Sequence, residues 1–415
     1  MNIVFVHQAF PAQFGAVAAG LIRRGHAVHA IASQAVPSQL ALWPDLSTCQ
    51  VHTYPAPHPA QIPDGVSDRV LEASLIRADR VAQTARRLTA SGWLPDVVVF
   101  HSGWGEGLYL RDVWPQALLI AYPELFGSSA LLSFDDPDAS PPTVARLQLL
   151  RSQNLMALAA LADADVGVTP TLYQRDSFPG PWRHRLQVIH EGVDTHTLYP
   201  DPDRRLRLTP GLQLSHGDPV LTFVSRSLEP LRGIGRFLRA LPAVQSAHPD
   251  LQVVVVGGDR SSYDPTSPHP GGYRGALLEE LGDRLDLSRV HFLGLLARAQ
   301  LTALLQVSAV HAYLSHPYVL SWSLLEAMAC GATVVASDTA PVREVIRDGH
   351  NGLLVPLHDL DAIATGLDQA LCGRSGQARL GQAARRTVEH RYARDHCVDT
   401  WCNWILSCYL LRSGH

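Results

Sequence analysis

The sequence contains no lysine, so all 34 of its basic residues are arginine. This absence excludes a P-loop lysine, a pyridoxal-phosphate Schiff base and any other lysine nucleophile. A bound phosphate group must therefore be held by arginine, histidine or backbone N–H groups. The 38 acidic residues outnumber the basic ones, and the formal net charge of −4 gives no reason to expect nucleic acid as a partner.

Cysteine pairs and long apolar runs are also missing. The six cysteines include no Cys-x-x-Cys pair, so we expect free thiols and no metal site. No apolar run reaches the roughly 18 residues that a membrane-spanning helix needs. The first six residues are typical of a short strand and not of a signal peptide, and we expect a cytoplasmic protein.

What is present is enough material for two domains. The chain has 415 residues, 46% of them hydrophobic, and buried strands alternate with helical segments along both halves. This alternation predicts two doubly wound α/β domains, 1–205 and 206–395, joined in a segment rich in Pro, Arg, Asp and Gly. We expect irregular structure over 37–63, with a flap among the alternatives. Residues 396–415 form an apolar helical stripe without a basic face, so packing on the protein is favoured over peripheral membrane contact, which stays open.

Several candidate binding residues follow predicted strands or begin predicted helices. His101 ends the strand that starts at residue 96, and Gly257 and Gly258 end another, where ligands gather in open α/β sheets. Gly15 starts the first helix and would allow close approach of a ligand. A packed histidine and glycines needed only for turns are the alternatives. Glu124, in the loop after another strand, is a weak acceptor-binding candidate against the reading of a solvated carboxylate.

Arg226 and Arg232 bracket a Glu-Pro turn before a helix in the second half. Two guanidinium groups at this spacing suit bidentate contacts to one diphosphate. The alternative is a surface pair in which Glu229 neutralises one arginine.

The segment 316–331 is predicted to be a ligand-binding loop that runs into a helix. Ser323 is a plausible N-cap and Gly331 ends the helix, so the positive end of the helix faces the loop. Glu326 would then accept hydrogen bonds from a ribose diol. The alternative is a capping box made by Ser323 and Glu326.

The residues 324–338, Leu-Leu-Glu-Ala-Met-Ala-Cys-Gly-Ala-Thr-Val-Val-Ala-Ser-Asp, and the run 344–356 resemble the signature of family 4 glycosyltransferases. This resemblance implies a GT-B fold of two Rossmann-like domains facing a central cleft, with the C-terminal helix crossing back to the first domain. In the family, two glutamates flank seven residues; the second binds the nucleotide ribose and the first binds the donor sugar. Glu326 matches the second, but the first falls on Tyr318, which supplies no charge.

The resemblance assigns further roles residue by residue. His101 would contact the transferred sugar, Arg226 matches the family arginine of the diphosphate site, and Arg232 replaces a lysine there. Leu320 and Ser321 stand in the loop that is usually Gly-Phe-Gly, and the backbone near Leu293 would contact the nucleobase. The resemblance also implies retention of anomeric configuration, with no metal and no other cofactor. The leaving phosphate itself is thought to act as the base in this family.

We therefore hypothesise a hexosyltransferase that moves a sugar from a nucleotide diphosphate sugar to an acceptor hydroxyl. A nucleotide-sugar epimerase of the same fold and a non-catalytic nucleotide-sugar binder are the alternatives. A dehydrogenase is disfavoured because Gly-x-Gly-x-x-Gly does not follow the first strand. The nucleobase, sugar, acceptor and oligomeric state do not follow from the sequence.

Overall fold

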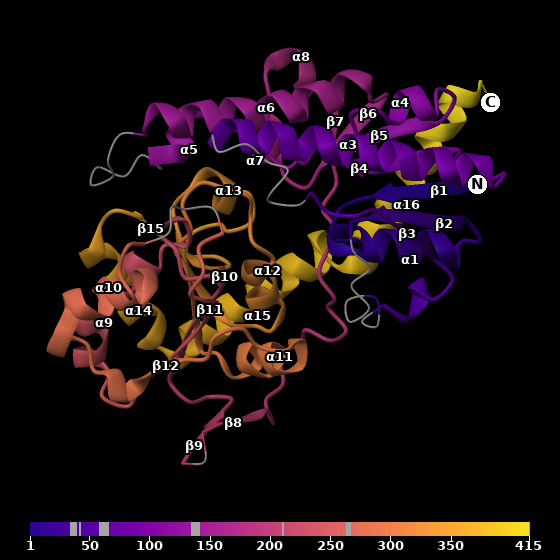
Figure 1. The fold of residues 1–415 in the computed structure, drawn as a ribbon. Coiled ribbons are helices and arrows are strands. Elements are labelled where there is room, and N and C mark those ends of the chain that lie inside the picture. Colours follow the sequence, from indigo (N-terminus) through magenta and orange to yellow (C-terminus); the bar gives the residue numbers. More distant parts are fainter. Residues whose placement is uncertain are drawn as a thin grey trace. The chain divides into compact units, whose positions relative to one another are not determined.

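The computed structural model describes residues 1–33, 40, 43–57, 66–133, 142–209, 211–262 and 267–414 (Figure 1). These residues form two compact units. Unit 1 contains the described residues up to Gly192 together with the segment from Arg394 onward, and unit 2 contains Val193–Ala393. The division after Gly192 precedes the boundary at 205/206 that composition suggested. Each unit is described by itself.

Unit 1 is built on a seven-stranded sheet in which every pair is parallel, in the order β3-β2-β1-β4-β5-β6-β7. Its strands β1, β4 and β5 are almost wholly buried because parallel sheets are covered on both faces. The strands are β1 (Asn2–Val6), β2 (Ala27–Ala32), β3 (Gln50–Thr53), β4 (Val97–His101), β5 (Leu118–Tyr122), β6 (Val166–Thr169) and β7 (Leu186–Val188). The strand order reverses between β1 and β4, where the chain leaves in opposite directions and a ligand site is expected.

The helices of unit 1 follow the predicted alternation. They are α1 (Gly15–Arg23), α3 (Val66–Ala90), α4 (Leu110–Val113), α5 (Ser129–Ser133), α6 (Val144–Asp163), α7 (Leu172–Ser177), α8 (Gly180–Arg183) and α16 (Arg394–Ser413), with 3-10 turns η1 (Ala12–Phe14) and η2 (Pro44–Leu46). The last helix, α16, packs on α1. Trp401, Cys402 and Ile405 of α16 are fully buried in the same core as Val17 and Leu21 of α1. The apolar stripe of this helix is therefore covered within unit 1.

One prediction for unit 1 was wrong in part. The stretch 37–63 contains the parallel edge strand β3 and is not irregular throughout. The sequence Gln-Val-His-Thr of β3 is too short and too polar to signal a strand by itself, and pairing with β2 supplies the order. Parts of this stretch, 37–39, 41–42 and 58–63, lie outside the described residues, and the expected flap cannot be placed there.

Unit 2 has a six-stranded parallel sheet in the order β12-β11-β10-β13-β14-β15. Its strands are β10 (Val220–Ser227), β11 (Gln252–Gly258), β12 (Val290–Phe292), β13 (Val310–Tyr313), β14 (Thr333–Ser337) and β15 (Leu353–Val355). Its helices are α9 (Ile234–Ala247), α10 (Gly272–Leu281), α11 (Arg298–Val307), α12 (Trp322–Ala329), α13 (Ala340–Arg343), α14 (Leu360–Leu371) and α15 (Arg374–Arg391), with 3-10 turns η4 (Pro230–Arg232), η5 (Gly282–Arg284) and η6 (Leu287–Arg289). The order reverses between β10 and β13, so the carboxyl ends of these two strands mark the expected ligand site.

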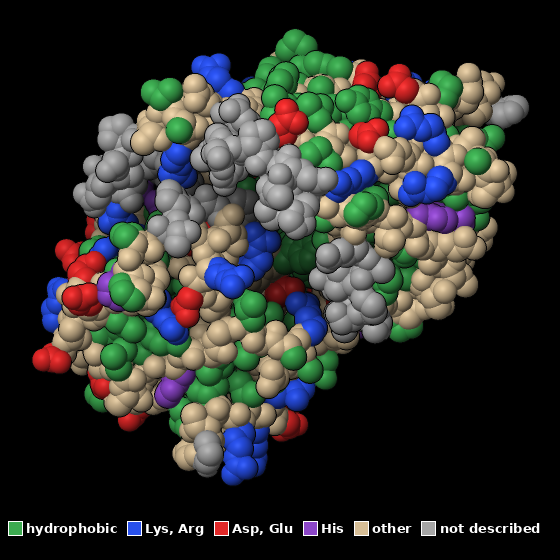
Figure 2. Space-filling view, viewed as in Figure 1, with side chains coloured by type: hydrophobic (Ala, Val, Ile, Leu, Met, Phe, Trp, Pro, Cys, Tyr) green, Lys and Arg blue, Asp and Glu red, His purple; other side chains and the backbone are tan. Residues whose placement is uncertain are grey.

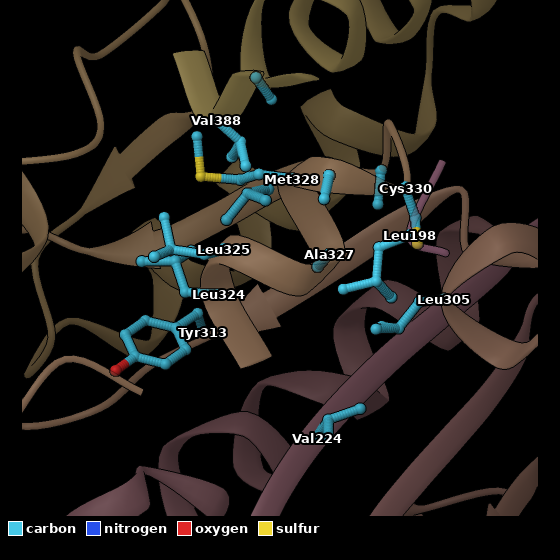
Figure 3. Packing of buried hydrophobic residues seen from close by; sticks show 14 of the residues in the cluster. Leu198, Val224, Leu305, Tyr313, Leu324, Leu325, Ala327, Met328, Cys330 and Val388 are labelled. Carbon is cyan, nitrogen blue, oxygen red and sulfur yellow. The ribbon is translucent and has the colours of Figure 1, made fainter. Parts of the chain in front are cut away.

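Two hydrophobic cores cover the faces of the unit 2 sheet. Figure 3 shows the first, in which Leu324, Leu325 and Met328 of α12 pack among side chains from other elements. The segment before the sheet, expected to be a linker, forms the antiparallel hairpin β8 (Arg205–Thr209) and β9 (Leu212–Ser215). Exposed residues alternate in β8 with Leu206 and Leu208, which pack against the core. Because the exposed residues are polar, the composition of this segment is that of a linker.

The face drawn in Figure 2 carries charges of both signs. In Figure 2, arginine side chains and acidic side chains are interspersed on the face drawn. Among the described helices, none is long and apolar enough to cross a membrane.

Candidate functional site

Polar side chains line a small cavity at the switch point of unit 2. Its walls come from the end of β10, the end of β13, the turn η4 and the start of α12. The polar residues of the lining are Ser225, Arg232, Tyr313, Ser315 and Ser321. The cavity holds about 10 Å³, room for no more than a water molecule, but its hydroxyl groups, one guanidinium group and a helix N-terminus are donors that can stabilise an anion placed beside them.

Tyr313 occupies the centre of this cluster and was missed by the sequence analysis. Figure 3 shows its ring beside the apolar core while its hydroxyl oxygen points away from the labelled side chains. The phenol oxygen accepts a hydrogen bond from the backbone N–H of Ser321 at 2.9 Å. Burial raises the pKa of Tyr313, and Arg232, Ser321 and Ser315 offset part of that rise. The phenol therefore keeps its proton at neutral pH and can donate it.

The two predicted arginines lie at the same end of β10 but differ in exposure. Arg226 is exposed near the end of the strand, and Arg232 is half-buried in η4. The guanidinium carbon of Arg232 lies 5.8 Å from the centroid of the Tyr318 ring, within the range of a cation–π contact. Glu229, between them, is buried and accepts hydrogen bonds from the Ser261 hydroxyl and the Ser262 N–H at 2.9 and 2.8 Å.

Gly233 fixes the turn that presents Arg232. Its φ of +77° is left-handed, and an added Cβ would lie 1.9 Å from the carbonyl oxygen of Leu314. Only glycine fits this approach between the arginine turn and the end of the β13 segment.

We expect Gly233→Ala to destabilise unit 2 by more than the roughly 1–3 kcal/mol that a left-handed non-glycine residue costs, because the clash adds to the strain. Urea unfolding measures this. Gly349→Ala is the matched control, since Gly349 has a φ of +66° with no atom within 4 Å of its Cβ direction. Equal losses for the two variants would show that the contact with Leu314 has no energetic role.

The loop-to-helix segment differs from the prediction at its cap. The N-cap of α12 is Ser321, whose hydroxyl accepts from the N–H of Ser323, and the helix begins at Trp322. The predicted cap at Ser323 is therefore wrong by two residues, and the capping box of Ser323 with Glu326 does not form. Gly331, with a φ of +79°, ends the helix as predicted.

Glu326 is held by an arginine that the sequence analysis did not single out. One carboxylate oxygen, Oε1, lies 2.6 Å from Nη1 of Arg298, at the start of α11. Glu326 is 5% exposed, whereas the side chain of Arg298 is 43% exposed. A carboxylate with one contact to a guanidinium group has further acceptor positions, so Glu326 can still accept a hydrogen bond from a hydroxyl group.

The residues of unit 2 that were predicted to contact the nucleotide through their backbone differ in how closely they are packed. The N–H of Gly257 donates to the carbonyl of Gly294 at 2.9 Å, and its Cβ direction is filled by Leu228 at 2.7 Å. Packing thus accounts for this glycine. Gly258 meets only ordinary contacts at 3.5 Å or more, so it leaves room beside the backbone. Leu293 is half-buried and its N–H joins the sheet, and Leu320 is buried.

In unit 1, two histidines meet at the strand-order reversal. His7 directly follows β1, His101 ends β4, and their rings are 5.2 Å apart in an edge-to-face arrangement. Both are buried, and each accepts a backbone hydrogen bond at its own Nδ1, from Ala9 and Gly103 respectively. Nε2 of His101 lies 3.7 Å from a carboxylate oxygen of Glu124, so the structure brings these two predicted residues together.

His7 was missed, although its place after the first strand was the available signal. Burial, with a smaller effect of His101, lowers the pKa of His7 to about 3. Burial likewise lowers the pKa of His311, in unit 2, to about 3. Both imidazoles are therefore neutral at physiological pH.

These two groups predict acid sensitivity. Their folded-state pKa lies below the ordinary 6.5, so their neutral forms stabilise the fold above pH 6.5 and that contribution is lost as the pH falls towards 3. The free energy of unfolding should be lower at pH 5.5 than at pH 7.5, by about 1.4 kcal/mol for each of the two histidines. Urea unfolding at the two pH values measures the difference, and an unchanged free energy of unfolding would contradict it.

Two buried glutamates of unit 1 each accept a hydrogen bond from a tyrosine. Glu106 is fully buried, and its Oε1 accepts from the Tyr54 hydroxyl at 2.9 Å. Burial raises the pKa of Glu106, against smaller opposing effects of His101 and Arg77. Glu191 accepts from the Tyr122 hydroxyl, and both are buried. The first contact ties the end of β3 to the loop after β4, and the second ties the end of β5 to the segment after β7.

Gly15 faces protein and not open space. An added Cβ would lie 2.7 Å from the indole ring of Trp43. Close packing at the start of α1 therefore accounts for glycine at this position, and ligand approach there stays a prediction.

Comparison with known proteins gives the class. Residues 24–198 match the family described as "Glycosyl transferase family 4 group", and residues 208–387 match "Glycosyl transferases group 1". The chain belongs to this family of glycosyltransferases, as the motif predicted.

Curated relatives carry related names. The chain is 27% identical over 370 residues to a D-inositol 3-phosphate glycosyltransferase of Kribbella flavida, covering 86% of this chain and 80% of the relative. It is 32% identical over 234 residues to a GDP-mannose-dependent alpha-(1-6)-phosphatidylinositol monomannoside mannosyltransferase of Mycolicibacterium smegmatis, covering 54% of this chain and 57% of the relative. Several other D-inositol 3-phosphate glycosyltransferases are matched over 56–64% of their length.

Solved structures share the fold. Sucrose-phosphate synthase from Thermosynechococcus elongatus aligns with a TM-score of 0.73 at 17% identity, covering 99% of this chain and all of that one. Anabaena HepE in complex with UDP and glucose aligns with a TM-score of 0.69 at 16% identity, covering 98% and 100%. The predicted GT-B fold is confirmed.

Proposed function

We propose that this glycosyltransferase transfers a hexose from a nucleotide diphosphate sugar to an acceptor hydroxyl with retention of anomeric configuration. The observation that carries the proposal is the cluster of donors at the switch point of unit 2, where Arg232, Ser321 and Tyr313 line one small cavity. The nearly buried Glu326 lies in the helix that begins at this cavity.

The hard step is loss of the diphosphate as positive charge builds on the anomeric carbon. Arg232 and Arg226 would hold the departing diphosphate, and the N-terminus of α12 would add backbone donors. Such preorganised donors stabilise developing negative charge by about 3 kcal/mol each in a closed site. The leaving phosphate oxygen would take the proton of the acceptor hydroxyl on the same face, which gives retention.

Glu326 would bind the ribose. Its carboxylate accepts hydrogen bonds, and the contact with Arg298 at 2.6 Å orients it. In the absence of nucleotide, Arg298 supplies the charge partner; a ribose diol would occupy the remaining acceptor sites of the same carboxylate.

Tyr318 would change the sugar subsite. A carboxylate at this position accepts hydrogen bonds from sugar hydroxyls, whereas a tyrosine whose ring lies against Arg232 offers one hydroxyl and no charge. The sugar would therefore be held with fewer strong contacts than in family members with glutamate here. This departure is also what keeps a nucleotide-sugar binder without transfer activity as the second candidate.

The residues of unit 1 would act on the sugar and the acceptor. His101 would contact the transferred sugar and Glu124, 3.7 Å from its ring, would contact the acceptor. Neutral His7 packs edge-on against His101 and holds its ring in place.

We also propose that transfer needs no metal ion and takes place in the cytoplasm. Arginine side chains in place of a divalent cation would neutralise the diphosphate. Activity that persists in excess EDTA would agree, and full loss restored by Mg²⁺ or Mn²⁺ would overturn this part of the proposal.

Tyr313 gives a prediction specific to this chain. Tyr313→Phe keeps the buried ring but removes the hydroxyl that Ser321 donates to and that can donate to a phosphate oxygen. We expect turnover to fall about tenfold, with weaker binding of the nucleoside diphosphate and unchanged binding of the nucleoside. Tyr273→Phe, which changes a half-buried phenol elsewhere in unit 2, is the control. Equal kinetics for Tyr313→Phe and the wild type would remove Tyr313 from the phosphate site.

The proposed function is tested by a transfer assay. Purified protein is given UDP-, GDP-, ADP- or TDP-sugars with a panel of polyol, sugar and phosphopolyol acceptors, and NMR records the anomeric configuration of the product. Transfer with retention supports the proposal. An inverted product would overturn the retaining mechanism, conversion of the donor without acceptor would indicate an epimerase, and binding with no transfer to any acceptor would favour the binder.

A further inference from the structure

A cluster of three metal-ligating side chains lies in unit 2, apart from the candidate donor site. Within the described ranges, His248, Asp368 and Cys372 form a group whose ligand atoms all lie within 4.8 Å of one another. Nε2 of His248 is 2.8 Å from Oδ1 of Asp368, and Sγ of Cys372 is 3.4 Å from the same oxygen. Ligands of a tetrahedral zinc ion are separated by roughly 3.5 Å, given bond lengths near 2.0–2.3 Å.

The fold, and not local sequence, builds this cluster. His248 is the C-cap residue of α9, while Asp368 and Cys372 lie four residues apart at the end of α14, with Cys372 as the C-cap. The two helices pack side by side over one face of the sheet, through a core that includes Leu241, Val244 and Leu367. The donor set is thus supported on two well-packed helices.

The electrostatic environment favours a cation. Both helices end at the cluster, so the negative ends of two helix dipoles are directed towards it, and Asp368 adds a carboxylate. The guanidinium of Arg289 donates to the carbonyl oxygen of His248 at 2.8 Å, which fixes that backbone while the imidazole faces Asp368. The side chains are accessible, with 18% exposure for His248 and 45% for Asp368, and Cys372 is exposed.

The position of the cluster separates it from the chemistry. α9 leads from the carboxyl end of β10 to the amino end of β11, so its C-terminus lies at the amino edge of the parallel sheet. Arg232, Tyr313 and the start of α12 lie at the carboxyl edge. A ligand bound at the cluster would therefore not touch a donor bound at the cavity.

We propose that His248, Asp368 and Cys372 form a site for a transition-metal ion of the zinc class, which clips the ends of α9 and α14 together. The imidazole nitrogen, one carboxylate oxygen and the thiolate sulfur supply three ligands, and water completes the shell. As the sulfur–metal bond forms, the thiol gives its proton to solvent. The role is structural, and the bound ion adds to the stability of unit 2.

The test is a titration of the full-length protein, stripped with EDTA and desalted, with ZnCl₂ in a calorimeter. We expect one ion per chain. His248→Ala and Cys372→Ser each remove a ligand, so zinc affinity should fall by at least the roughly 10–100-fold that loss of an outer-shell partner costs. His350→Ala and Cys408→Ser, changed outside the cluster, are the matched controls and should bind as the wild type does. Unchanged zinc affinity in His248→Ala and Cys372→Ser would overturn the proposal.

Cobalt gives a readout of the sulfur ligand itself. Wild-type protein with CoCl₂ should show thiolate-to-cobalt charge-transfer absorption, and Cys372→Ser should not. Zinc should also raise the melting temperature of the wild type and of both controls, but not that of the two cluster variants. Charge-transfer absorption that survives Cys372→Ser would place the metal elsewhere and overturn the assignment.

Discussion

Replacing Arg232 by alanine should lower kcat about a hundredfold or more, because in the proposed mechanism the half-buried guanidinium would be a preorganised donor to the departing diphosphate. Arg232 contacts the Tyr318 ring and lines the same cavity as Ser225, Tyr313 and Ser321, beside which the phosphate is proposed to bind. KM for the donor should rise less than kcat falls, since the interaction strengthens as charge develops on the leaving group. Steady-state kinetics with the best donor of the panel measure both.

Arg226→Ala should likewise lower turnover about a hundredfold, although its exposure makes solvent screening stronger than at Arg232. Arg232→Lys is the conservative variant: it restores positive charge without the planar fork and should recover only part of the loss. Arg236→Ala, a substitution of a half-buried arginine in the adjoining helix α9, is the matched control. Near-normal turnover in Arg232→Ala and Arg226→Ala would remove the diphosphate assignment.

Glu326→Ala should weaken binding of the nucleotide about 10- to 100-fold, because it removes the proposed acceptor of the ribose hydroxyls. It also leaves Arg298 without its carboxylate partner at 2.6 Å. Glu326→Gln keeps shape and one acceptor but removes the charge, so its loss should be intermediate. Calorimetry with the nucleoside diphosphate measures these affinities, and circular dichroism checks that α12 is intact.

A comparison of ribose and deoxyribose nucleotides isolates the diol. The wild type should prefer the ribonucleotide, and Glu326→Ala should bind both equally. If Glu326→Ala keeps wild-type affinity, the carboxylate serves only its ion pair with Arg298 and no ribose contact exists. Arg298→Ala, by contrast, should weaken binding less than Glu326→Ala, because it leaves the carboxylate acceptor in place.

The strand–helix alternation and the position of strand ends were predictable because buried parallel strands are continuous apolar runs. His101 and Gly257 were placed at carboxyl ends in this way, and Gly331 at the end of α12. Elements whose order depends on pairing were not predictable: the polar strand β3 and the hairpin β8–β9 carry no such run. The N-cap of α12 is Ser321 and not the predicted Ser323, because either serine could cap the helix and only the loop geometry selects between them.

Candidate site residues could be proposed from the sequence where one motif contains them, and not where the fold brings them together. Arg226, Arg232 and Glu326 lie in segments of recognisable pattern. Tyr313 ends a strand and Arg298 starts a helix, and neither residue belongs to a pattern that marks a site. Their contacts with Ser321, 8 residues on, and with Glu326, 28 residues on, are seen only in the folded structure. The same holds for His248 and Asp368, 120 residues apart, which no cysteine spacing could reveal.

The central claim is that unit 2 binds the diphosphate of a nucleotide sugar at the cavity beside Arg232, and ligand-induced stabilisation tests it most directly. UDP-, GDP-, ADP- and TDP-sugars are added separately to the wild type and to Arg232→Ala, and the melting temperature is recorded with each. We predict that at least one nucleotide sugar stabilises the wild type, that its free nucleoside does not, and that Arg232→Ala loses most of the shift. A nucleotide sugar that shifts the wild type and Arg232→Ala equally, or no shift with any of the four, would contradict the account.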